Sequence, residues 1–110
     1  MNLPEQLKKY IDTRDAMLVK KGHYENDLLI NTFSELVVRK EINFGGRASC
    51  GGKTDLTWTA FMAWQEIVRK ARKLGFEINV ESIKQKNGSP TRSGGFWDEN
   101  KYTLISGINA

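Results

Sequence analysis

The sequence predicts an α+β fold, in which N-terminal helices and a long central helix pack against a small antiparallel C-terminal sheet. Apolar residues recur at three- and four-residue spacings before residue 76, most regularly over residues 57–74. From residue 76, apolar and polar residues alternate instead, which is the period of a half-buried strand. Because the helical segments come before the strand-like ones, we expect one face of the sheet to pack on the central helix.

The central helix, expected over residues 57–74, has the most consistent pattern in the chain. Its apolar stripe consists of Ala60, Phe61, Trp64, Ile67, Val68, Ala71 and Leu74. Capping oxygens and an early negative charge are available from Thr54, Asp55 and Thr57. Gly75 follows at the position where a left-handed cap is usual. Trp58 and Met62 widen the stripe, which indicates burial on two sides, either by the first helices or by a second subunit.

Two further helices are expected upstream. The first covers residues 3–21, starts near Pro4 and ends at Gly22. Its broken apolar stripe consists of Leu3, Leu7, Tyr10, Ile11, Met17 and Leu18. Its outward-facing residues are Lys8, Lys9, Asp12, Arg14 and Asp15. The second helix covers residues 27–40. A strand over its second half is an open alternative, because residues 36–44 also alternate at strand period.

The other segments predict loops and the C-terminal sheet. Four glycines in nine residues predict a loop over residues 45–53. A strand is expected over residues 76–81, followed by a polar, turn-rich segment over residues 85–95. The pattern over residues 96–105 predicts a hairpin with residues 98–100 at or near its turn. The last five residues are expected to form a loose tail.

The chain has 110 residues, and we expect residues 1–110 to form a single domain. A formal charge of +4 favours an anionic partner, such as nucleic acid or an acidic protein surface. Cys50 is the only cysteine, which excludes an intramolecular disulfide. No segment resembles a signal peptide or a membrane span, so we expect no membrane partner and a cytoplasmic location.

Cations of the central helix and of the C-terminal segments are the candidate nucleic-acid contacts. These residues are Arg69, Arg72, Lys73, Lys84, Lys86 and Arg92. Trp97 and Tyr102 are candidate stacking surfaces, because aromatic rings among cations are typical of proteins that bind unpaired bases. In the competing interpretation, the helix cations only complement the helix dipole and the aromatic rings belong to the core.

The glycine-rich segment over residues 45–54 is a candidate anion site. Gly52, Lys53 and Thr54 match the end of a phosphate-binding loop, but Arg47 occupies the position of that motif's first glycine. The parallel sheet that usually surrounds such a loop does not fit into this chain. A looser anion site at the start of the central helix would use Arg47, Lys53 and Thr54. A plain connector is the competing interpretation.

Catalytic and metal sites are not expected. Cys50 and His23 are each unique, and no pattern places them together as nucleophile and base. One cysteine and one histidine are too few for a structural zinc site, so we predict neither a metal nor a cofactor. Glu77 and Glu81 are interpreted as the solvated face of a strand.

We therefore expect a small non-catalytic binding or regulatory domain that contacts nucleic acid or another polyanion through a basic surface. One alternative is a protein–protein interaction module or homodimer whose basic charge is incidental. Another is a small enzyme that binds a phosphorylated ligand at residues 45–54.

Overall fold

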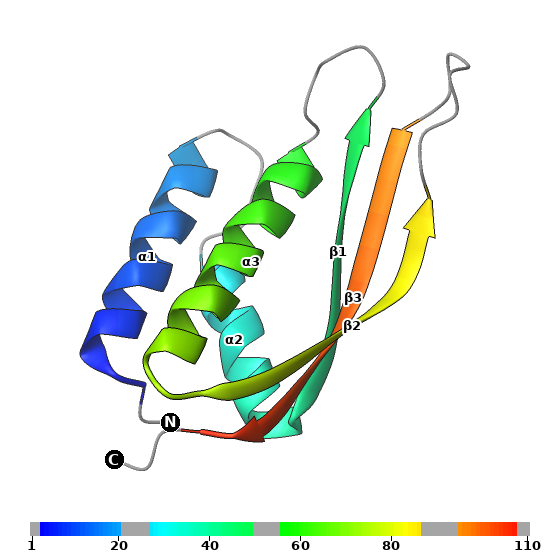
Figure 1. The fold of residues 1–110 in the computed structure, drawn as a ribbon. Helices are drawn as coiled ribbons and strands as arrows, with labels where there is room; N and C mark the ends of the chain where they lie inside the picture. Colours follow the sequence, from blue (N-terminus) through cyan, green and yellow to red (C-terminus); the bar gives the residue numbers. More distant parts are fainter. Residues whose placement is uncertain (1–2, 21–26, 50–55, 87–94, 108–110) are drawn as a thin grey trace.

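The computed structural model describes residues 3–20, 27–49, 56–86 and 95–107. Within them the order of elements is α1 (Glu5–Lys20), α2 (Leu28–Arg39), β1 (Glu41–Ser49), α3 (Leu56–Lys73), β2 (Glu77–Lys86) and β3 (Gly95–Ser106) (Figure 1). The strands form one antiparallel sheet in the order β1-β3-β2. The described helices lie on one side of this sheet (Figure 1). The predicted α+β fold is confirmed.

The core lies between the sheet and the helices, with Trp64 of α3 at its centre. The Trp64 ring is fully buried and packs against Phe33 of α2, Phe44 of β1 and Tyr102 of β3, with centroids 6.0, 5.3 and 5.5 Å away. The predicted apolar stripe of α3 is confirmed as buried at Ala60, Phe61, Trp64, Ile67, Val68 and Ala71. Contacts from one helix and two strands thus converge on one aromatic side chain.

The predicted helices are confirmed, with small shifts at their ends. Gly75 has φ 112° after α3, as expected for a left-handed cap. After α2, Lys40 has φ 70°, and its N–H donates to the Leu36 carbonyl oxygen at 2.8 Å. This cap ends α2, so the strand considered over residues 36–44 begins only at Glu41. Two residues that the apolar patterns placed inward are largely exposed, Met17 (48%) and Met62 (45%).

Asp15 of α1 is buried, so the prediction that it faces outward is wrong. The residue is 4% exposed, and its carboxylate accepts the N–H groups of Leu29 (2.7 Å) and Ile30 (3.0 Å). These groups belong to the first turn of α2, where N–H groups have no partner inside the helix. Asp27, at the N-cap position itself, makes no side-chain capping bond. Asp15 therefore caps α2 from another helix, a role that spacing within α1 does not signal.

Strand β1 covers the first part of the loop that was expected over residues 45–53. The loop prediction is wrong for residues 45–49, and residues 50–53 lie outside the described residues. A Cβ atom at Gly45 would lie 2.6 Å from the Asp98 carbonyl oxygen and 3.0 Å from the Glu99 Cβ atom. Glycine is therefore required at this position because β1 approaches β3 closely, and not because the chain turns.

Strand β3 is continuous, so the hairpin predicted over residues 96–105 is wrong. Residues 98–100, expected at the turn, lie inside β3 and have register partners in both β1 and β2. Neighbours on both sides satisfy the backbone groups of this polar stretch, which makes a central strand stable there. Both ends of the turn-rich segment expected over residues 85–95 belong to strands, because β2 extends to Lys86 and β3 begins at Gly95, and residues 87–94 lie outside the described residues. Ser106, expected in the tail, is the last residue of β3.

Candidate functional site

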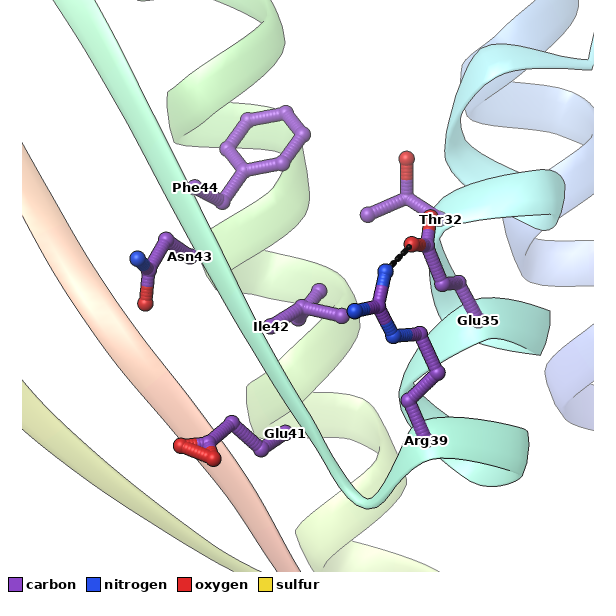
Figure 2. A pocket seen from close by; sticks show the side chains of 7 residues that line it. All are labelled: Thr32, Glu35, Arg39, Glu41, Ile42, Asn43 and Phe44. Carbon is purple, nitrogen blue, oxygen red and sulfur yellow. Dashed lines mark hydrogen bonds and ion pairs between the residues drawn. The ribbon is translucent and has the colours of Figure 1, made fainter.

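The face of the sheet turned away from the helices, which we call the outer face, carries polar residues. In Figure 2, Ile42 and Phe44 of β1 point toward the helices, whereas Glu41 and Asn43 point the other way. The strand register assigns seven described residues to the outer face: Glu41, Asn43, Asn79, Glu81, Glu99, Lys101 and Thr103. In the part of the chain that the structure describes, no helix covers this face (Figure 1).

Charges in the middle of the outer face are paired. The Lys101 Nζ atom lies 2.8 Å from the Glu41 Oε1 atom, and Glu81 is the register partner of Lys101 on the other side. The bond to Glu41 is the main cause that raises the pKa of Lys101, and Glu81 adds to it. Glu77 and Glu81 are both exposed to solvent. With two carboxylates beside one ammonium group, this part of the face carries a net negative charge, and its arrangement agrees with a solvated strand.

Four residues predicted as binding sites come together where β1 and β2 end and β3 begins. Arg47 of β1 is the register partner of Trp97 of β3, and Trp97 is the partner of Lys86 of β2. Lys84 is the partner of Glu99, two residues farther along β3. The structure describes the backbone of these four predicted residues and not their side chains. Arg47, Trp97 and Lys86 form one row across all three strands, which we call the Trp97 row.

The predicted cations of α3 lie in the helix layer and not on the outer face. Arg72 donates from Nε (3.1 Å) and Nη2 (2.6 Å) to the Ile78 carbonyl oxygen of β2. Arg69 and Arg72 also line a pocket of about 190 Å³ beside β2 and β3. Lys73 is exposed in the last turn of α3. Arg72 therefore connects α3 to the sheet, whereas Arg69 and Lys73 are surface cations.

Tyr102 is a core residue, so its interpretation as a base-stacking surface is wrong. The residue is 1% exposed, and its ring packs edge-on against Trp64. Burial raises the pKa of the Tyr102 hydroxyl, and the hydrogen bond donated by Asn100 Nδ2 at 3.2 Å opposes this rise. The nearby Trp64 N–H also acts to lower the pKa of the Tyr102 hydroxyl, although the Trp64 Nε1 atom has no hydrogen-bond partner among the described residues. Trp97 is the remaining candidate for stacking.

A groove of about 380 Å³ runs along the free edge of β1, beside α2 (Figure 2). Its lining residues are Thr32, Glu35, Arg39, Glu41, Ile42, Asn43 and Phe44. Arg39 Nη1 donates to Glu35 Oε1 at 2.9 Å, so the two α2 charges in the groove neutralise each other. The sequence did not signal this groove, because it exists only when β1 lies beside α2.

The other candidate residues, His23, Cys50, Lys53, Thr54 and Arg92, lie outside the described residues. Within the described ranges, no group of three or more His, Cys, Asp or Glu residues is placed to hold a metal ion. None of the described helices combines the length and apolar character needed to cross a membrane. Comparisons with protein-family models, curated proteins and solved structures give no match to this chain. The functional argument therefore depends on the chain's own geometry and chemistry.

Proposed function

We propose that this chain is a non-catalytic binding domain that holds single-stranded nucleic acid on its outer face, at the Trp97 row. The supporting observation is the strand register, which brings Arg47, Trp97 and Lys86 from three separate segments into one row. An aromatic ring between cations is the combination with which proteins stack unpaired bases and hold the phosphate backbone. The row lies on a sheet, and the strands of a sheet hold its positions more rigidly than loops would.

Alternation along the strands assigns the three backbone positions of the row to the same face of the sheet. Side chains two or four residues apart on one strand share a face. Arg47 is four residues beyond Asn43, and Trp97 is four residues before Lys101, and both reference residues belong to the outer face. Lys86 is the register partner of Trp97, past the bulge in β2. With strands about 4.8 Å apart, the backbone positions of Arg47 and Lys86 are separated by about 10 Å across β3.

The charge distribution also supports binding at this end of the sheet. In the middle of the outer face, Lys101 is neutralised by Glu41 and Glu81. Near the Trp97 row, the sequence supplies the cations Arg47, Lys84 and Lys86 against the carboxylates of Asp98 and Glu99. The chain as a whole carries a formal charge of +4. A polyanion is therefore attracted to the Trp97 row more than to the middle of the sheet.

Binding of a labelled oligothymidine and of a duplex, measured by fluorescence anisotropy at low salt, tests the proposal. We expect the single strand to bind more tightly than the duplex. Trp97→Ala should weaken single-strand binding by about 1–3 kcal/mol, because a base loses its stacking partner. The matched control is Ile105→Ala, which removes an apolar side chain that is 58% exposed on the same strand. This control should bind like the wild type.

The competing function, a protein-interaction module with incidental charge, makes the opposite prediction. It predicts that neither the oligothymidine nor the duplex binds at low salt, the condition in which phosphate contacts are strongest. Absence of binding would therefore contradict the proposed function. Equal losses in Trp97→Ala and Ile105→Ala would contradict the placement of the site at the Trp97 row.

A further inference from the structure

Strand β1 has a row of backbone groups along one side that no described strand pairs with. It is an edge strand, and among the described residues it pairs with β3 alone. The Leu104 N–H donates to the Lys40 carbonyl oxygen at 2.8 Å, and antiparallel partners exchange bonds at every second residue. The N–H and C=O groups of Glu41, Asn43 and Gly45 therefore point away from β3. Such a row is a template for pairing with another strand.

The two edges of the sheet differ in how well they fit a further strand. Along β2, the register with β3 shifts between Glu77 and Ile78 and again between Ser82 and Lys84. Bulges of this kind bend an edge and interrupt its row of backbone groups, which protects it from pairing. The register of β1 with β3 continues through nine residues without a shift. The edge of β1 is therefore the one that can accept a strand.

Phe44 lies in β1 next to the groove along this edge. Its ring stacks on Phe61 (centroids 6.4 Å apart, planes at 11°) and on Trp64 (5.3 Å, 20°). The residue is only half-buried, and it lines the groove together with Thr32 of α2 (Figure 2). The aromatic stack of the core thus ends at the open edge of the sheet, where one more aromatic side chain would extend it.

We propose that β1 pairs antiparallel with β1 of a second copy of this chain, about a twofold axis at Phe44. In this register, Glu41 is opposite the partner's Arg47, and the twofold symmetry makes this pair twice. Phe44 is opposite the partner's Phe44 in a pair without direct hydrogen bonds, where facing side chains lie closest. Moving the axis by one residue puts Gly45 or Ser49 opposite Glu41 and removes the charge complementarity. This self-complementarity of charge is the observation that favours a second copy of the same strand as the occupant.

Sedimentation velocity over a range of protein concentrations, without nucleic acid, tests this pairing independently of the proposed function. We expect a sedimentation coefficient that rises with concentration toward that of a dimer. Asn43→Pro removes an N–H that points away from β3, and proline is tolerated on an edge strand. The variant should stay folded by circular dichroism and thermal unfolding, but it should sediment as a monomer.

A charge exchange across the twofold axis gives a second test that does not rely on proline. Arg47→Glu puts like charges opposite each other at two places and should weaken dimerisation roughly tenfold or more. Adding Glu41→Lys together with Lys101→Glu to this variant restores opposite charges across the axis, keeps an ion pair between residues 41 and 101, and should recover most of the loss. Met62→Ser, at the exposed methionine of α3, is the control and should dimerise like the wild type.

Three results would overturn the proposal. The first is a chain that stays monomeric at every concentration. The second is a dimer that persists in folded Asn43→Pro, or a dimer that Glu41→Lys together with Lys101→Glu fails to restore in the Arg47→Glu background. The third is a dimer lost only in Met62→Ser, which would place the contact on α3.

Discussion

Asp15 joins two helices through a single buried carboxylate. Both of its oxygens accept N–H groups from the first turn of α2, at Leu29 and Ile30. Because Asp27 has φ 65° and makes no capping bond, this contact supplies the cap that α2 otherwise lacks. A negative charge at a helix N-terminus is also favoured by the helix dipole. The contact sets the position of α1 relative to α2 and hence one side of the core.

We predict that Asp15→Ala lowers the free energy of unfolding by about 1–3 kcal/mol, because two N–H groups lose a charged acceptor. Asp12→Ala is the matched control, since it removes the same charge from an exposed position one turn away. It should change stability by less than about 0.5 kcal/mol. Urea denaturation of both variants measures the difference, and equal values would show that Asp15 does not cap α2.

The pH dependence of this contact has a definite sign. Burial is the largest cause that raises the pKa of Asp15 above 3.8, with Asp12 and Asp27 adding to it and the two N–H bonds opposing it. The folded chain therefore binds a proton at a pH where the unfolded chain has lost it. Proton binding by Asp15 therefore stabilises the folded chain as the pH falls from neutral through the pKa of Asp15 in the folded state. This stabilisation is lost as the pH rises through that pKa. The stability of wild type relative to Asp15→Asn should increase over that fall, and a decrease would contradict this assignment.

At the scale of the elements, the close approach of β1 to β3 at Gly45 fixes how the sheet is assembled. Gly45→Ala brings a methyl group against the Asp98 backbone, which cannot move aside like a flexible side chain. We expect a loss of roughly 1–3 kcal/mol in the free energy of unfolding, as for overpacked sites. Gly107→Ala is the control, because its Cβ atom would meet Phe76 at an ordinary 3.6 Å. Similar stability of the two variants would show that the strands can separate without cost.

Helices could be predicted from the sequence because their signal is local. The stripe of α3 and its cap at Gly75 follow directly from spacing within one segment. The antiparallel sheet was also predicted, but the pairing of β1 with β3 was not, because these strands are far apart in the chain. Glycine at Gly45 was interpreted as a sign of a loop, whereas it allows two strands to approach closely. Asp15 was misplaced for a similar reason, since its partners are on another helix. The four residues near the Trp97 row were identified by type, but only the register brings them together.

In the molecule as a whole, the cations that the sequence analysis grouped as one basic surface fall into two sets, one in the helix layer and one in the sheet. Arg69, Arg72 and Lys73 belong to the helix layer, whereas Arg47 and Lys86 belong to strands of the sheet. Arg72 also donates to the Ile78 carbonyl oxygen, so replacing it would disturb the fold as well as the charge. Lys73 is therefore the better residue for a comparison between the layers.

The salt dependence of oligothymidine binding in Lys86→Gln and Lys73→Gln tests the central claim most directly. Each variant removes one positive charge, from the Trp97 row in the first case and from the helix layer in the second. For single strands, each phosphate contact contributes about 0.7 to the slope of log K against log salt concentration. We predict that Lys86→Gln reduces the slope by about this amount and that Lys73→Gln leaves it unchanged. A reduced slope in Lys73→Gln with an unchanged slope in Lys86→Gln would contradict binding on the outer face.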